Sequence, residues 1–152
     1  MNKILFLSIL LLISCSEKKQ STTSPKKNIE SEQKETILSI EINSAGGKLG
    51  YVSTFRMTKD SIIFNSDMTA APDKKTALRN PLKKGEAAKI FHDIDLKDFD
   101  RAVEGQSKQP FDGPDEVISI QTEKKDYFKL NATDNKTWMK ILKLRSKYVD
   151  QP

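Results

Sequence analysis

Apolar side chains recur at every second position in the first part of the chain, which is the pattern of half-buried β-strands. Segment 38–42 alternates leucine and isoleucine with polar residues, and segments 51–58 and 61–65 show a similar alternation. The segment 44–48 contains two glycines, which accept the positive φ angles of a tight turn. We therefore expect a globular part that begins near Thr36 and opens with a three-stranded antiparallel meander.

The apolar pattern changes to a helical period in the second half of the chain. Apolar residues within 87–94 recur at three- and four-residue intervals and predict a helix. Residues 66–84 and 100–114 are polar and contain prolines, so we expect two loops. Two further strands are predicted at 116–122 and 126–131. Their inward-facing residues are expected to be Ile118, Ile120, Phe128 and Leu130.

The last predicted element is a helix from about Lys136 to Val149, which Asp134 or Asn135 can cap. The predicted element order is then βββ-α-ββ-α. Packing helices on one face of an antiparallel sheet buries the apolar surface of both kinds of element. The sequence thus predicts one α+β domain whose antiparallel sheet carries the helices on one face.

The composition limits the class of protein. The chain has 152 residues, of which 36% are hydrophobic and 31% charged, and its formal net charge is +5. It contains one Cys, one His and one Trp. These counts exclude a polytopic membrane protein, a disulfide scaffold and a metal site built from several Cys or His residues.

The first fifteen residues have the layout of an export signal. Lys3 supplies a positive charge, residues 4–13 are apolar apart from one serine, and Cys15 follows. Ten residues are too few to span a bilayer, which needs about 20, but they suit the apolar part of a signal peptide. Segment 12–15, Leu-Ile-Ser-Cys, resembles the lipobox of bacterial lipoprotein precursors, and the chain is similar in style to small lipoproteins of Bacteroidetes. The resemblance implies cleavage before Cys15 and lipidation of its thiol.

The lipoprotein resemblance also sets the expected location and domain organisation. Two or more acyl chains hold a protein stably in a membrane. An aspartate directly after the lipidated cysteine would resemble an inner-membrane retention signal. The chain has Ser16 at this position, which favours the outer membrane. We expect a signal peptide at 1–14, a lipidated Cys15 with a disordered polar tether at 15–35, and a single domain at 36–152. Which leaflet carries the protein stays open.

The predicted C-terminal helix separates its charges from its apolar residues. Lys136, Lys140, Lys143 and Lys147 lie within about 60° of one another on a helical wheel, opposite the side that holds Trp138. One interpretation is a solvated face that backs the packing face. The other is a contact surface for an anionic partner, such as lipopolysaccharide phosphates or an acidic protein.

Residues suited to metal binding or acid–base chemistry are few. His92 is the only imidazole, and a zinc site normally needs several His or Cys ligands. Asp112, Asp115 and Glu116 lack the spacing of a calcium-binding loop, so we expect a turn there. The aspartates within 93–100 are the remaining candidates for carboxylate catalysis. The sequence implies no cofactor and no metal, and it contains no nucleic-acid-binding motif.

Ser61 is a candidate modification site, because Asp60-Ser61-Ile62 resembles the short O-glycosylation sequon of Bacteroidetes. Taken together, the sequence favours a non-enzymatic envelope lipoprotein whose domain binds another macromolecule, a protein or an envelope polymer, in the manner of an inhibitor, immunity protein or accessory subunit. Two alternatives stay open. One is a periplasmic hydrolase that uses carboxylates, and the other is a binder of a small ligand or glycan through the loop 66–84.

Overall fold

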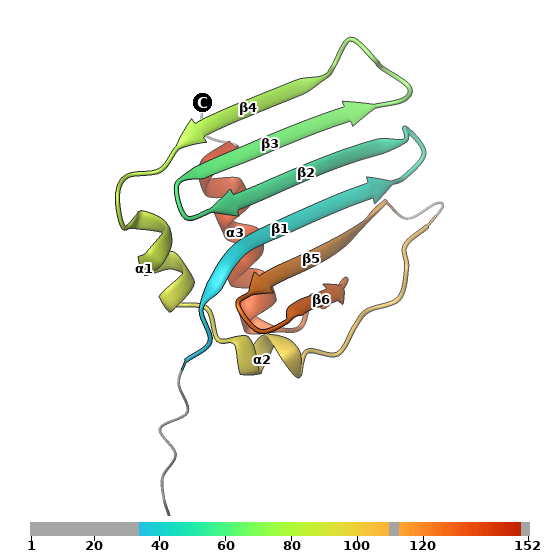
Figure 1. Ribbon diagram of the computed structural model, residues 1–152. Helices are drawn as coiled ribbons and strands as arrows, with labels where there is room; N and C mark the ends of the chain where they lie inside the picture. The colour runs from blue at the N-terminus through green and yellow to red at the C-terminus, as the bar shows by residue number, and fades with distance from the viewer. Residues whose placement is uncertain (1–33, 110–112, 150–152) are drawn as a thin grey trace, which may run out of the picture. The chain divides into compact units, whose positions relative to one another are not determined.

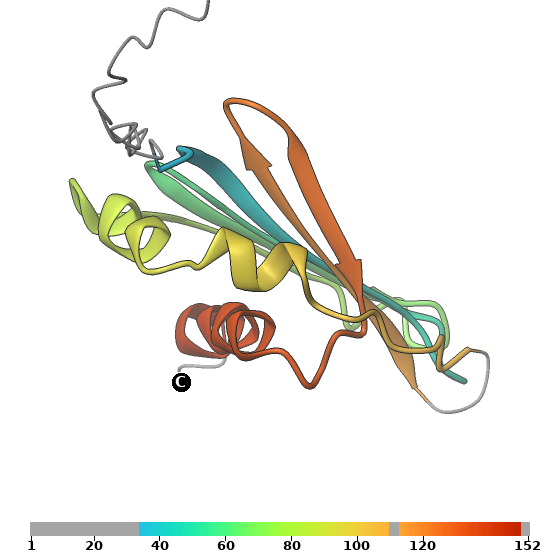
Figure 2. The same cartoon turned by 90° about the horizontal axis from the view of Figure 1, so that it is seen from below.

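The computed structural model describes residues 34–109 and 113–149. These residues form a six-stranded antiparallel sheet in the order β4-β3-β2-β1-β5-β6. Figure 1 shows the sheet from its open face, and Figure 2 shows the three helices together on the other face. The described part of the chain is therefore an α+β fold with an antiparallel sheet, as the sequence predicts.

The elements follow one another in a simple order along the chain. The strands are β1 (Ile37–Gly46), β2 (Tyr51–Thr58), β3 (Ser61–Met68), β4 (Thr76–Pro81), β5 (Pro114–Thr122) and β6 (Asp126–Leu130). The helices are α1 (Glu86–His92), α2 (Leu96–Asp100) and α3 (Lys136–Val149). From β4 at one edge, the chain crosses the helical side of the sheet through α1 and α2 and returns as β5 beside β1 (Figure 1).

The core lies between the sheet and the helices. The antiparallel register aligns inward side chains of neighbouring strands in rows, and each of these side chains is at most 6% exposed. The two apolar rows are Ile118–Ile42–Phe55–Phe64 and Ile120–Ile40–Met57–Ile62. Trp138 and Ile141 of α3 belong to the same cluster and are fully buried. Phe99 of α2 stacks on Trp138 with 6.4 Å between ring centroids, so the two helices pack through aromatic rings.

The predicted element order is incomplete, because one strand and one helix were missed. Segment 66–84, predicted as a loop, contains the end of β3 and the whole of β4. β4 is an edge strand in which only Leu78 is half-buried, so its side chains show no alternation, and backbone pairing with β3 defines it. α2 has only five residues, which is too short to show a helical period.

Three expectations about which side chains face the core are wrong. Phe128 is 69% exposed, because the pairing of Ile120 with Tyr127 turns Tyr127 inward and Phe128 outward. Leu130 follows Phe128 by two residues in β6, so it lies on the same outer face and is not part of the core. Leu38 is 44% exposed, because a β-bulge between Ile37 and Ser39 turns Ile37 toward the core instead. All three errors follow from the two-residue side-chain period of a strand, in which a shift of one residue exchanges the faces.

The predicted C-terminal helix is confirmed. α3 runs from Lys136 to Val149, and the Asn135 side-chain oxygen accepts a hydrogen bond from the backbone N–H of Trp138 at 2.9 Å. That bond satisfies one of the amide groups that a helix leaves unpaired in its first turn. The cap holds the start of α3 in the position from which Trp138 enters the core.

Candidate functional site

The four lysines predicted on one side of α3 are all exposed. Three of them, Lys136, Lys140 and Lys143, line a shallow groove of about 360 Å³ together with Asp134, Asn135 and Met139. The side chain of Met139 is 41% exposed and supplies apolar surface to this groove. We call this surface the lysine groove. Its lysines are exposed, on the side of α3 opposite buried Trp138. Figure 2 shows α3 packed on one face of the sheet.

The lysines differ in how far they are engaged by the protein itself. Lys140 donates a hydrogen bond to the backbone oxygen of Asp93 at 2.7 Å. The Lys147 ammonium lies 4.6 Å from the centroid of the Tyr148 ring and 3.2 Å from its hydroxyl oxygen. Within residues 34–109 and 113–149, Lys136 and Lys143 have neither a hydrogen bond nor an ion pair from their side chains. Two cationic groups of the lysine groove are thus available to an external ligand.

A second concave site lies between the opposite side of α3 and the sheet, where the inner face of the sheet changes from apolar to polar side chains. The row next to Ile118–Ile42–Phe55–Phe64 consists of polar residues, with Glu116 on β5 followed by Ser44, Ser53 and Ser66 on the next three strands. Serine side chains are too small to fill the space below the C-terminal part of α3. A cavity of about 210 Å³ remains there, which we call the Ser44 pocket. Its apolar lining is Tyr51, Phe64, Pro114 and Val149, and its polar lining is Ser44, Glu116 and Arg145.

The polar groups of the Ser44 pocket are bonded to one another. Arg145 reaches down from α3, and its Nη2 lies 2.7 Å from Oε1 of Glu116, with both side chains at most a quarter exposed. Arg145 Nη1 also donates to Ser44 Oγ at 2.9 Å, and Ser44 Oγ donates to Glu116 Oε1 at 3.3 Å. This leaves Oε2 of Glu116 and the remaining guanidinium N–H groups without a partner in the described part of the chain.

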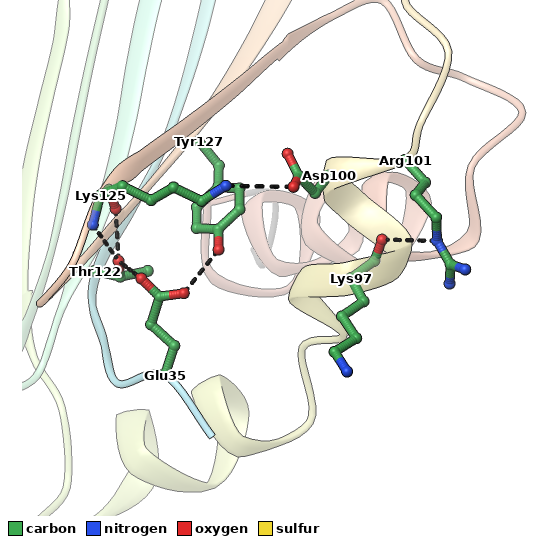
Figure 3. Close-up of polar contacts among 7 residues, drawn as sticks. All are labelled: Glu35, Lys97, Asp100, Arg101, Thr122, Lys125 and Tyr127. Atoms are coloured by element: carbon green, nitrogen blue, oxygen red, sulfur yellow. Dashed lines mark hydrogen bonds and ion pairs between the residues drawn. The ribbon is translucent and has the colours of Figure 1, made fainter. Parts of the chain in front are cut away.

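A third polar cluster holds the start of the domain. Glu35 accepts a hydrogen bond from the Tyr127 hydroxyl at 2.7 Å and another from the Thr122 hydroxyl (Figure 3). The Lys125 ammonium lies 4.1 Å from the centroid of the Tyr127 ring and 3.3 Å from a carboxylate oxygen of Asp100. The hydrogen bond from Thr122 is the main reason that the pKa of Glu35 is lowered, whereas burial, followed by the bond to Glu35, raises the pKa of Tyr127 to about 12. The cluster joins the segment that precedes β1 to the β5–β6 hairpin.

The aspartates considered for carboxylate catalysis all have roles in local structure. Asp95 caps α2 by accepting a hydrogen bond from the backbone N–H of Asp98 at 3.0 Å. Asp98 accepts from the Thr137 hydroxyl at 2.7 Å, and this bond is the main cause of its lowered pKa. Asp93 and Asp100 face lysines on α3 and on the β5–β6 turn. A general acid needs a raised pKa to hold its proton near neutral pH, and Asp98 is shifted the opposite way.

His92 and Ser61 do not line either concave site. The side chain of His92 is 78% exposed and lies 3.6 Å from Asp93. Ser61 begins β3, and its hydroxyl lies 3.1 Å from that of Thr58. Cys15 and the predicted signal peptide lie outside the described residues, as does Asp112. No group of three or more His, Cys, Asp or Glu residues that could hold a metal occurs among residues 34–109 and 113–149.

Asp115 and Glu116 lie in strand β5, so the turn that the sequence predicts there is wrong for these two residues. Asp115 accepts hydrogen bonds from the Ser107 hydroxyl at 2.5 Å and from the backbone N–H of Lys108 at 2.7 Å, which hold segment 101–109 against β5. Glu116 points the other way, into the Ser44 pocket. Alternation along β5 therefore separates two carboxylates that are adjacent in sequence.

The Ser44 pocket was not predicted from the sequence, although part of its signal is visible there. Ser44 continues the inward series of Ile40 and Ile42, and Ser53 continues that of Phe55 and Met57, so serines occupy positions where the pattern demands apolar residues.

No helix in the described part of the chain is long and apolar enough to cross a membrane. Comparison of the chain with protein-family models, curated proteins and solved structures gives no match.

Proposed function

We propose that this protein is an envelope lipoprotein, anchored by lipid on Cys15 in the outer membrane, whose domain is a non-enzymatic binding module for an anionic macromolecule. The lysine groove of α3 is the contact surface. An inhibitor, an immunity protein and an accessory subunit of an envelope complex all fit this description, since each acts by binding a partner.

The observation that carries the proposal is the state of the lysine side chains. Lys136 and Lys143 line the groove beside exposed Met139, and neither is paired within the described residues. A groove that combines cationic groups with apolar surface offers both charge attraction and a site for desolvation.

The spacing of the lysines gives the helix itself no stability. Lys136 and Lys140 are four residues apart, as are Lys143 and Lys147, and like charges at this spacing destabilise a helix by about 0.2–0.5 kcal/mol per pair. A single exposed charge contributes little to binding, but a row of charges raises the rate of association with an oppositely charged partner. The arrangement is therefore more useful for binding than for folding.

The test is crosslinking in cells, with a C-terminally tagged full-length protein as bait and mass spectrometry of the recovered complexes. The binding variant carries Lys→Gln at positions 136, 140, 143 and 147. A control variant carries Lys→Gln at positions 59, 74, 83 and 84, which are exposed lysines outside α3 and outside the lining of the lysine groove, and loses the same charge. We expect a recurrent partner with wild type and control that is lost with the binding variant, and equal recovery with all three proteins would refute the groove as contact surface.

The anchor is tested separately by fractionation of cells. Cys15→Ala removes the only thiol in the chain, so the lipid cannot be attached. We expect this variant in the soluble fraction, while Cys15→Ala protein that stays in the membrane fraction contradicts the lipoprotein assignment. Wild-type protein recovered with the inner membrane contradicts the outer-membrane location alone.

A further inference from the structure

The Ser44 pocket departs from the packing of the rest of the inner sheet face. Two successive rows of that face are apolar and closely packed, and the third is made of a carboxylate and small hydroxyl groups. The Ser53 hydroxyl in this row is buried and has no hydrogen-bond partner among the described residues. The unpartnered Ser53 hydroxyl weakens the core, because a buried polar group without a partner is costly, whereas the Ser44 hydroxyl of the same row bonds to Arg145 and Glu116.

The charges of the pocket select the kind of ligand that fits it. The Arg145 guanidinium and the Glu116 carboxylate are in contact and cancel each other's charge. A net anion is attracted by one and repelled by the other, and the same holds for a net cation. The site therefore favours a ligand without net charge.

The hydrogen-bonding groups of the pocket that have no partner limit the class of ligand further. Glu116 offers an acceptor, Oε2, next to the unused N–H donors of Arg145. A ligand that matches this pair presents a donor and an acceptor on neighbouring atoms. Two adjacent hydroxyl groups do so, because each hydroxyl both donates and accepts.

The apolar side of the pocket suits the C–H surface of a ring. Phe64 and half-buried Tyr51 line the cavity with Val149. The volume of about 210 Å³ is below the roughly 300–1,000 Å³ of pockets for drug-sized molecules, so the ligand is a small one. We propose that the Ser44 pocket binds a neutral, hydroxyl-rich ring, namely a single sugar unit, through Glu116 and Arg145. This site is independent of the lipid anchor and of the lysine groove.

The test is a titration followed by NMR of isotope-labelled full-length protein in detergent micelles, with glucose, galactose, mannose and N-acetylglucosamine as probes. The comparison probes are glycine, a zwitterion whose two charges cancel, and inorganic phosphate, an anion. We expect at least one sugar to cause saturable shifts of the backbone amides of Ser44, Tyr51 and Glu116. The amides of Glu41 and Arg56, on the open face of the sheet, should not shift.

Substitutions in the pocket test whether Glu116 and Arg145 bind the sugar. Arg145→Met and Glu116→Gln should each weaken sugar binding about tenfold or more, which is the scale of one lost hydrogen bond to a charged group. Glu116→Gln keeps the size of the side chain, so it remains informative if Arg145→Met fails to fold. Arg56→Met is the matched control, because Arg56 also pairs with a glutamate, at 3.8 Å, but on the opposite face of the sheet.

Three results would overturn the proposal. The first is that no sugar shifts the pocket amides, and the second is that glycine or phosphate shifts them while the sugars do not. The third is equal loss of sugar binding in Arg56→Met and in the pocket variants. High salt should leave the affinity for the sugar unchanged, whereas it should weaken the binding of an anionic partner to the lysine groove. The two proposals can therefore fail separately.

Discussion

Replacing Phe99 by alanine tests how the helices are joined to the sheet. Phe99 is fully buried and stacks on Trp138 with only 7° between the ring planes. Removing a buried phenyl ring loses about 1.5–3 kcal/mol of hydrophobic transfer free energy and about 0.5–1.5 kcal/mol of ring–ring interaction. With the cavity that remains, Phe99→Ala should lower the free energy of unfolding by about 3–5 kcal/mol.

The matched control is Phe128→Ala, the same substitution at a side chain that is 69% exposed. A change at such a surface position should stay within about 0.5 kcal/mol. The pair of variants therefore tests the register of β6 directly. If Phe128 pointed inward, as the sequence pattern indicates, the two substitutions would have similar costs.

Urea unfolding followed by tryptophan fluorescence measures both variants. Trp138 is the only tryptophan of the chain, and because it is fully buried its emission reports on the core. With a urea dependence of about 1–3 kcal/mol per molar, the midpoint of Phe99→Ala should fall by roughly 2 M. A Phe99→Ala midpoint that matches wild type, or a Phe128→Ala midpoint shifted as far as that of Phe99→Ala, would refute the packing described above.

Four further substitutions have defined outcomes. The lowered pKa of Glu35 means that its hydrogen bonds stabilise the folded state above the ordinary pKa of a glutamate, and this contribution is lost as pH falls through the lowered value. The difference in melting temperature between wild type and Glu35→Gln should therefore shrink under acidic conditions. The folded state keeps the Tyr127 proton up to about pH 12, so wild type should lose more stability than Tyr127→Phe as pH rises above about 10 in alkaline melting scans. Asn135→Ala should cost about 1 kcal/mol in urea unfolding through loss of the α3 cap, with no cost if the cap is unimportant. A Cβ atom at Gly105 would lie 2.4 Å from the backbone oxygen of Asn131, so Gly105→Ala should accelerate proteolysis within 101–109, and unchanged cleavage contradicts this contact.

The sequence alone was sufficient where one element contains its own signal. α3 was predicted with its bounds and cap, because fourteen residues show the helical period clearly and the cap acts within one turn. The meander of β1, β2 and β3 was predicted for the same reason, since each strand alternates and short turns join them. The fold class follows from these elements.

Other features depend on partners that are distant in the sequence. β4 has almost no apolar pattern and is a strand because β3 offers a free edge. The orientation of Phe128 depends on its pairing with Ser119 across a hairpin, and a shift of one residue reverses it.

The two concave sites differ in the same way: one could be inferred from a single element, and the other depends on contacts between distant elements. The lysines of the lysine groove lie on a single helix, so they could be found by helical geometry before the structure was known. The Ser44 pocket joins a strand to a helix 101 residues later in the chain through the hydrogen bond between Ser44 and Arg145. The sequence by itself determined which side chains are polar and how they repeat within an element. Only the tertiary structure decided which elements lie side by side, because sheet register and helix packing bring together residues whose spacing in the sequence carries no period.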